Sequence, residues 1–252
     1  MASPLRIIAR LDVKNEHVIK GIHLEGLRKV GDPNELALRY YEQGVDEIVF
    51  MDAVASLYDR NNLFHIIEQA CRNVFVPIAI GGGLRTLEDV SRALGAGADK
   101  VVINTGAVRN IGLVEQIAAK FGSQCLIGSI EAKRAGSGWT AYIDNGREPS
   151  GHDVLDWARQ LENAGVGEIL VTSIDQEGTG RGFDVALARA LEEATSRPII
   201  VSGGYAGAKD VSRLLAETHP SAIAVAGALH YGRTDVARIR GEVEACMAGS
   251  MA

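Results

Sequence analysis

The sequence predicts a single (β/α)8 barrel, the TIM barrel of the α/β class. Eight short apolar segments alternate with longer segments of helical period, and uninterrupted apolar runs are typical of strands buried on both faces of a parallel sheet. The 252 residues fit the length at which closed α/β barrels form one domain. Residues 44–50 and 76–83 recur, 121 positions later, as residues 165–171 and 197–204. This repeat predicts two half-barrels, of about residues 1–123 and 124–252.

The candidate strands are apolar segments, most of which contain β-branched residues. They are Ile7–Val13, Glu47–Asp52, Val76–Ile80, Lys100–Asn104, Cys125–Glu131, Glu168–Ser173, Pro198–Ser202 and Ala222–Ala226. Helix signals lie between them: Asp32-Pro33 supplies a cap and a first-turn proline, and Thr86 begins a capping sequence. Further helices are expected over about residues 110–121, 152–164 and 234–247. Strands and helices that alternate with short linkers favour a closed barrel over an open doubly wound sheet.

Two connections are longer than the rest and occupy equivalent places in the two halves. Residues 14–31 follow the first strand and residues 132–151 follow the fifth, and both segments are polar and contain glycine. Loops that follow the strands of such a barrel form its catalytic face. We therefore expect both connections to be lids or substrate clamps. Residues 139–143 have enough β character for a small hairpin inside the second connection.

Composition and charge exclude several classes of protein. The net charge of −6 argues against a nucleic-acid or anionic-membrane partner held by overall charge. No apolar run is long enough to span a bilayer, and no signal segment precedes Ile7. Neither the three cysteines nor the six histidines show metal-ligand spacing, so no metal and no cofactor are expected. The odd number and the spacing of the cysteines predict no disulfide framework, which favours a reducing, cytoplasmic setting.

Two carboxylates are the candidate catalytic groups. Asp12 and Glu131 lie at or near the ends of the first and fifth strands, on opposite sides of the barrel mouth. A carboxylate at the C-terminal end of a barrel strand is placed where the loops meet the substrate, and two such groups can divide acid and base roles. The alternative is that each merely forms an ion pair with its neighbour, Lys14 or Lys133.

Two glycine clusters predict phosphate binding. Each cluster follows a strand and precedes a helix, and the next strand of each half ends in a second turn of small residues. Glycine lets a ligand approach the backbone, and a helix N-terminus favours an anion. The candidate residues are Gly82, Gly83, Asn104, Thr105, Ser202, Gly203, Gly204, Ala226 and Gly227. The pattern predicts a small-molecule substrate with a phosphate at each end; plain turn formation is the alternative.

Two further groups of polar residues complete the candidates. Asp175, Glu177 and Gly178 follow the sixth strand and are expected to contact the substrate, with ordinary turn formation as the alternative. Four charged residues instead begin strands and should gather at the opposite, bottom face. They are Arg6, Glu47, Lys100 and Glu168. Bottom-face residues usually serve stability, and mutual ion pairing would explain these four.

Several short segments, in the same order over nearly the whole chain, match one known family. They include Arg6-Ile7-Ile8, Leu11-Asp12-Val13-Lys14, Gly81-Gly82-Gly83, Lys100-Val101-Val102-Ile103-Asn104-Thr105, Thr172-Ser173-Ile174-Asp175, Ser202-Gly203-Gly204 and Ala226-Gly227-Ala228-Leu229-His230-Tyr231. With these segments the chain resembles the cyclase subunit of imidazole glycerol phosphate synthase, a lyase of histidine biosynthesis. The resemblance implies a partner glutaminase subunit at the N-terminal face of the barrel, which supplies ammonia to a bis-phosphate ribotide held at the mouth.

The resemblance also assigns residues. It implies that Asp12 and Glu131 are catalytic and that the four bottom-face charges form a gate for ammonia, in place of a purely structural role. The chain departs from the family pattern where Glu131 and Glu177 each replace an aspartate and where Arg10 replaces a cysteine. Strand alternation should turn Arg10 toward the same face as Asp12, where it would narrow the ammonia path.

These departures leave two alternatives open. One is a related barrel that delivers ammonia for amidination of a sugar in surface-polysaccharide biosynthesis, because such a conduit would keep the gate and the phosphate turns while its catalytic acids change. The other is the sister sugar-phosphate isomerase, which shares the repeat and both phosphate sites. The bottom-face gate disfavours the isomerase, since an isomerase admits no ammonia.

Overall fold

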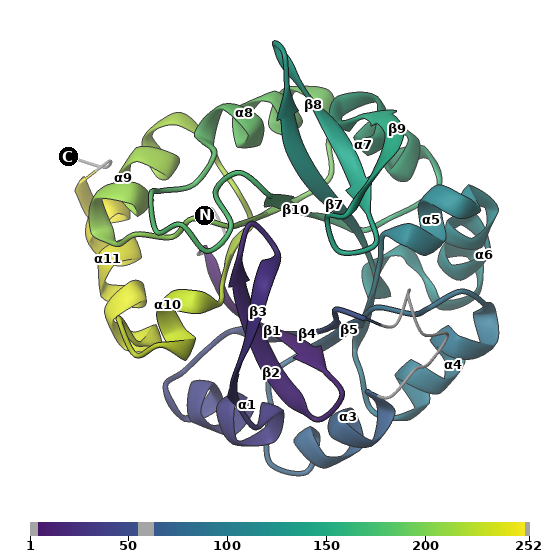
Figure 1. Ribbon diagram of the computed structural model, residues 1–252, viewed down its shortest axis with the longest axis horizontal. Helices are drawn as coiled ribbons and strands as arrows, with labels where there is room; N and C mark the ends of the chain where they lie inside the picture. Colours follow the sequence, from purple (N-terminus) through teal and green to yellow (C-terminus); the bar gives the residue numbers. More distant parts are fainter. Residues whose placement is uncertain (1–4, 55–62, 250–252) are drawn as a thin grey trace.

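The computed structural model describes residues 5–54 and 63–249. Eight parallel strands close into a barrel, in the order β1-β4-β5-β6-β7-β10-β11-β12 and back to β1 (Figure 1). The barrel strands are β1 (Arg6–Lys14), β4 (Glu47–Asp52), β5 (Ile78–Gly81), β6 (Lys100–Ile103), β7 (Leu126–Ala135), β10 (Glu168–Ser173), β11 (Ile199–Ser202) and β12 (Ala222–Val225). The predicted (β/α)8 barrel is confirmed, and each candidate strand forms one strand of the barrel.

The helices form a ring outside the strands (Figure 1). They are α1 (Pro33–Glu42), α3 (Phe64–Ala70), α4 (Leu87–Gly95), α5 (Thr105–Arg109), α6 (Ile111–Phe121), α7 (Val154–Asn163), α8 (Val185–Ala194), α9 (Ala208–Glu217), α10 (Gly227–His230) and α11 (Val236–Gly249). The predicted caps are present: Asp32 accepts hydrogen bonds from two amides of α1, and Thr86 forms a reciprocal capping box with Asp89.

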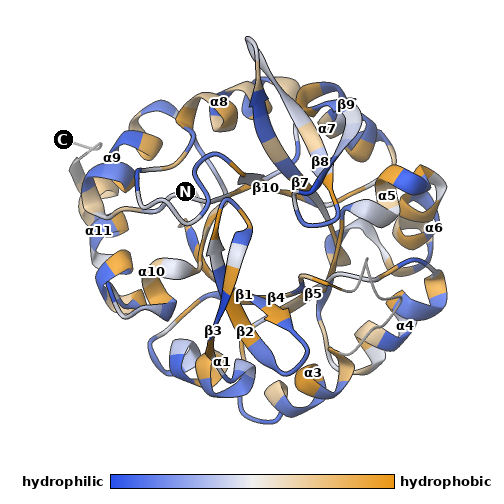
Figure 2. Cartoon of the chain, in the orientation of Figure 1, coloured by the Kyte–Doolittle hydropathy of each residue, from blue (hydrophilic) through white to orange (hydrophobic). Residues whose placement is uncertain are grey.

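Apolar side chains form two separate layers, one between strands and helices and one inside the barrel. In Figure 2 the orange of hydrophobic residues lies on the strands and on parts of the helices in the ring. We call the inside set the inner apolar layer. It consists of Ile8, Val49, Ala79, Val102, Ile127, Leu170, Ile200, Ala222 and Ala224. Because strand side chains alternate between faces, these residues show which other positions of each strand point into the barrel.

The two long connections are hairpins, and their expected role as lids or substrate clamps stays a prediction. Strands β2 (His17–Ile22) and β3 (Glu25–Gly31) form the first hairpin, and β8 (Gly138–Ile143) and β9 (Glu148–Asp153) form the second. Both continue the sheet, because β1 and β7 extend past the barrel and pair antiparallel with β2 and β8. The hairpin expected around residues 139–143 is confirmed. In Figure 1 the first hairpin lies over the barrel mouth.

The backbone carries matching features at the repeat offset. Gly82 and Gly203, which are 121 positions apart, have φ angles of 94° and 96°. Asp32 and Asp153, at the same offset, both cap helices that follow a hairpin. The division into two half-barrels stays a prediction.

No helix in the described ranges is both long and apolar enough to cross a membrane. Most of the short segment before Ile7, where no signal was expected, lies outside these ranges.

Candidate active site

The two candidate catalytic carboxylates both point into the barrel. On β1, Ile8 belongs to the inner apolar layer, so Arg10 and Asp12 share its inward face. On β7, Ile127 belongs to that layer, which turns Glu131 inward as well. Asp12 and Glu131 are each only 5% exposed. The strands therefore place both groups, buried, just inside the mouth.

Asp12 is surrounded by cations. Its Oδ1 accepts a hydrogen bond from Nε of Arg10 at 2.9 Å, and its Oδ2 lies 3.6 Å from Nζ of Lys20. Lys20 in turn is paired with Glu177. Burial alone would raise the pKa of Asp12, but the charges of Arg10 and Lys20 outweigh it, and the pKa lies below its ordinary value. Asp12 is therefore ionised. We call Arg10, Asp12, Lys20 and Glu177 the mouth cluster.

Glu131 has an opposite environment. Its Oε2 accepts hydrogen bonds from Nδ2 of Asn104 at 3.1 Å and from the amide of Gly146 at 2.8 Å. Neither donor is charged. Burial raises the pKa of Glu131 to about 7, although the charge of Arg10 works against the rise. The pairings with Lys14 and Lys133, considered above, are wrong, because other groups bind both carboxylates. Two carboxyl groups whose pKa values are driven apart are suited to base and acid roles.

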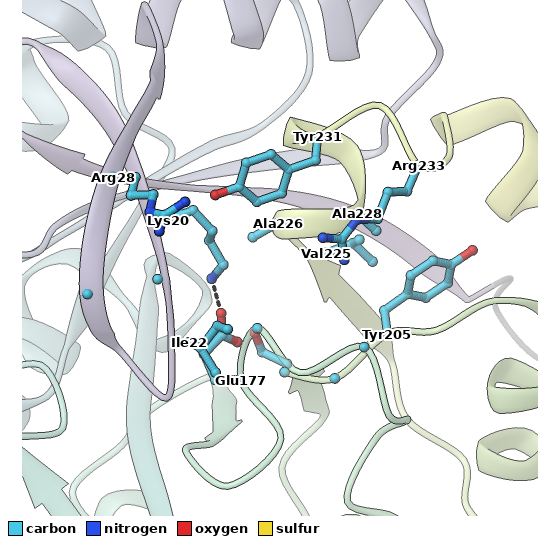
Figure 3. Close-up of a pocket in the computed structure, with 18 of the residues that line it drawn as sticks. Lys20, Ile22, Arg28, Glu177, Tyr205, Val225, Ala226, Ala228, Tyr231 and Arg233 are labelled. Carbon is cyan, nitrogen blue, oxygen red and sulfur yellow. Dashed lines mark hydrogen bonds and ion pairs between the residues drawn. The ribbon is translucent and has the colours of Figure 1, made fainter.

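A cavity of about 700 Å³ opens beside the mouth cluster. Figure 3 shows Lys20 reaching from the first hairpin toward Glu177, with Arg28, Tyr231 and Arg233 also lining the space. The predicted residues that line this cavity come from three turns of the second half. They are Glu177, Gly178, Ser202, Gly203, Gly204, Ala226 and Gly227.

A second, smaller cavity of about 170 Å³ lies on the other side, and Glu131 is part of its lining. It holds the predicted residues of the first half, Gly82, Gly83, Asn104 and Thr105. Two cations, Arg85 and Arg109, also line it. The nine candidate phosphate residues thus divide into two groups, one in each cavity.

Glycine is required at the turns of both cavities. Gly82 has a φ of 94°, and a Cβ there would meet the carbonyl oxygen of Asp52 at 2.5 Å. Gly204 has a φ of 98°, and a Cβ there would lie 2.1 Å from the carbonyl oxygen of Gly182. Any other residue would be strained in both respects. At these turns, therefore, backbone atoms without side chains line both cavities.

Helix α4 follows the first glycine cluster and α9 follows the second, and a short helix begins at the next turn of each half. In the capping box of α4, the amide of Asp89 donates to Oγ1 of Thr86 and the amide of Thr86 donates to Oδ2 of Asp89. The short helices α5 and α10 begin directly at the cavities, after Asn104 and Ala226, and neither cap residue makes a side-chain capping hydrogen bond.

The loop after β10 divides between two tasks. Glu177 lines the larger cavity, whereas Asp175 lines neither cavity and accepts a hydrogen bond from the amide of Arg134 at 2.7 Å, in the β7–β8 arm. The same loop holds the first hairpin, because the amide of His23 donates to the carbonyl of Glu177 at 2.8 Å. Asp175 therefore binds the backbone of the β7–β8 arm, and its contact with the substrate stays a prediction.

Sequence reasoning missed Lys20, Arg28, Arg109, Tyr231 and Arg233. Lys20 lies on β2, whereas the polar, glycine-containing segment 14–31 predicts a loop; the apolar pair Val18 and Ile19 just before Lys20 is the signal for a strand there. No grouping of three or more His, Cys, Asp or Glu side chains suited to a metal occurs in the described part of the chain.

At the bottom of the barrel, Arg6, Glu47, Lys100 and Glu168 form a closed cycle of ion pairs, which we call the basal ring. Arg6 contacts Glu47 at 2.8 Å and also pairs with Glu168. Lys100 contacts Glu47 at 2.9 Å and Glu168 at 2.6 Å. Burial raises the pKa of Glu47, whereas the hydrogen bonds from Arg6 and Lys100 outweigh burial at Glu168 and lower its pKa. The four residues meet as the sequence predicted.

Comparison with known proteins agrees with this arrangement. Residues 6–235 match the family described as "Histidine biosynthesis protein". The chain is 56% identical to imidazole glycerol phosphate synthase subunit HisF of Legionella pneumophila over 203 residues, which cover 80% of this chain and 96% of the relative. It is 47% identical to the HisF subunit of Myxococcus xanthus (strain DK1622) over 235 residues, 93% of each chain. With this fold, these cavities and these relatives, the chain belongs to the histidine biosynthesis protein family, among its HisF-type subunits.

Proposed function

We propose that this chain is the cyclase subunit of an imidazole glycerol phosphate synthase, a lyase acting in histidine biosynthesis in the cytoplasm. At the mouth, ammonia reacts with phosphoribulosyl-formimino aminoimidazole carboxamide ribotide. The products are imidazole glycerol phosphate, aminoimidazole carboxamide ribotide and the water formed from the ketone oxygen. The observation that carries the proposal is a pair of buried carboxylates with opposed pKa shifts beside two glycine-lined cavities.

The two cavities supply the sites for the two phosphates of this substrate. In the larger one, Lys20, Arg28 and Arg233 offer positive charge beside the turn at Gly203 and Gly204. In the smaller one, Arg85 and Arg109 stand beside the turn at Gly82 and Gly83. Fixing both ends of the ribotide presents its reacting centre to Asp12 and Glu131, and such positioning accounts for much of an enzyme's rate.

The carboxylates then divide the proton transfers. Asp12, ionised beside Arg10 and Lys20, takes the proton that the ammonia nitrogen loses after attack. Glu131, with a pKa of about 7, carries a proton in much of the enzyme at neutral pH and donates it to the departing nitrogen. A positioned general acid or base typically contributes about 10²- to 10⁴-fold to the rate.

The opposite face is the proposed docking site of the glutaminase subunit. The basal ring lies at the axial opening of the barrel, and the inner apolar layer lies directly above it. An apolar layer favours neutral ammonia over ammonium, because burying an unpaired charge is far more expensive than burying a neutral group. The ring would therefore have to open for ammonia to enter.

An assay without the partner tests the proposal. Purified protein is mixed with the ribotide and an ammonium salt at alkaline pH, where free ammonia replaces the glutaminase. We expect product formation that Asp12→Asn abolishes and that Glu131→Asp retains. If neither the parent protein nor Glu131→Asp turned over the ribotide, the cyclase assignment would fail, and the result would favour the ammonia conduit for sugar amidination.

A further inference from the structure

Arg10 occupies an unusual place for an arginine. It lies on the inward face of β1, between Ile8 of the inner apolar layer and Asp12 at the mouth, and it is only 2% exposed. A buried guanidinium is stable only if its charge and its N–H groups are matched. The other inward residues at the level of Ile8 are apolar. Arg10 therefore does more than fill the barrel.

Its contacts fix the side chain at two points. The Nε of Arg10 donates to Oδ1 of Asp12 at 2.9 Å, and its Nη1 donates to Oγ1 of Thr172 at 2.6 Å. Thr172 belongs to β10, which β11 and β12 separate from β1 in the sheet. The side chain therefore crosses the barrel interior. The planar fork of arginine suits such a fixed, two-point geometry.

The charge of Arg10 reaches three titratable groups at the mouth. It favours the ionised form of Asp12, opposes the charged form of Lys20, and favours the ionised form of Glu131. The other charged or titratable groups facing Asp12 are Glu177, paired with Lys20, and His230 of α10. Burial lowers the pKa of His230 to about 4, so this histidine stays neutral where the enzyme works.

We infer that Arg10 is a positioning residue of the reaction: it holds the Asp12 carboxylate by one nitrogen, anchors itself on Thr172 by another, and sets the charge balance of the mouth. This inference rests on the proposed function. It assigns no contact between Arg10 and the substrate. Arg10 acts through Asp12, Lys20 and Glu131.

The test compares Arg10→Gln with two variants that separate charge from anchoring. Arg10→Lys keeps the charge and loses the fork, and Thr172→Val keeps Arg10 and removes its second anchor. For each, kcat and KM are measured against pH with the ribotide and a fixed concentration of unprotonated ammonia. Thermal unfolding checks that each variant is folded.

For Arg10→Gln we expect kcat to fall by about 10- to 100-fold, because a misplaced carboxylate loses reactivity, while KM changes by about twofold or less. Both limbs of the pH profile should move to higher pH, by about one unit, because every titrating group loses the same positive neighbour. Arg10→Lys and Thr172→Val should lower kcat and leave both limbs in place. A loss of activity in Arg10→Gln with unmoved limbs would overturn the inference, and so would unchanged kcat.

A direct titration keeps the inference testable without catalysis. Carboxyl groups labelled with ¹³C are followed by NMR against pH, with Asp12→Asn used to assign the Asp12 signal. In Arg10→Lys the Asp12 pKa should stay close to that of the parent, and in Arg10→Gln it should rise. If the parent protein fails to turn over the ribotide, only the proposed function fails. An unshifted Asp12 signal in folded Arg10→Gln would instead reject the role of Arg10.

Discussion

The basal ring and the mouth cluster are built from the same parts. Each contains one arginine, one lysine and two carboxylates, and in each the arginine comes from β1. In the basal ring every charge touches two partners of opposite sign, so the cycle is closed. In the mouth cluster the pairs run as an open chain from Arg10 through Asp12 and Lys20 to Glu177.

The difference shows how one set of residues serves two purposes. In the closed cycle each charge has two ion-pair partners, although the buried Oε1 of Glu47 has no hydrogen-bond partner. The open chain ends in Glu177, which lines the larger cavity, and Glu131 stands outside the chain, with uncharged donors bonded to its Oε2. A carboxyl group left without a paired cation in a buried site keeps its proton to higher pH. Closure therefore favours stability, and openness favours chemistry.

The largest expected effect is on catalysis by the open chain. Asp12→Asn removes the base and leaves Arg10 and Lys20 without their shared carboxylate. We expect turnover of the ribotide with ammonium salt to fall by about three orders of magnitude, within the range for loss of a general base. Steady-state kinetics measures the loss. Retention of even a tenth of the parent rate would show that Asp12 is not the base.

Glu131→Gln should divide activity from stability. The pKa of Glu131 rises from 4.5 to about 7 on burial, so the folded protein holds a proton that the unfolded chain has released. The stabilisation is complete below about pH 4.5 and is lost as the pH rises to about 7. The neutral Gln undergoes no such loss. We expect the variant to be roughly 3 kcal/mol more stable than the parent at alkaline pH, with no gain at acidic pH.

Urea unfolding of both proteins at an acidic and an alkaline pH measures this difference. The same variant should lose about 10²-fold in kcat, because Gln has no proton to donate. A stability difference that did not change with pH would show that folding leaves the pKa of Glu131 unshifted, and its role as the acid would be rejected.

Opening the basal ring should affect stability. Lys100→Met leaves Glu47 and Glu168 with Arg6 alone, and the Glu47 side chain is only 2% exposed. We expect the free energy of unfolding to fall by about 2 kcal/mol. This loss is smaller than for a fully buried ion pair, because the side chains of Lys100 and Glu168 are partly exposed to solvent. Urea unfolding provides the measurement. Turnover with ammonium salt should stay close to that of the parent, since that ammonia needs no gate.

The smallest effect is expected at Lys14, the neighbour of Asp12 in sequence. Its side chain is exposed and belongs to neither charged group. Lys14→Ala should leave both kcat and the unfolding free energy unchanged, within about 0.5 kcal/mol for an exposed site. The variant is the matched control for Asp12→Asn. A large loss of activity in Lys14→Ala would revive the simple ion pair with Asp12.

The sequence predicted the positions that follow from strand periodicity. The basal ring could be anticipated because Arg6, Glu47, Lys100 and Glu168 all begin strands, and the ends of parallel strands meet. Lys20 and Asp175 could not be placed in this way. Their positions depend on how hairpins and loops fold over the barrel, which involves contacts between distant segments rather than any local period.

The loop after β10 has a mechanical consequence. Through His23 and Glu177 it is tied to the first hairpin, and through Asp175 and Arg134 to the β7–β8 arm. Two arms that rise from opposite sides of the barrel are thus linked by one short stretch of backbone. Neither arm can swing far without pulling on the other or breaking the link between them. Their amides should therefore exchange hydrogen as one cooperative unit, so that a substrate seated against one arm slows exchange in both.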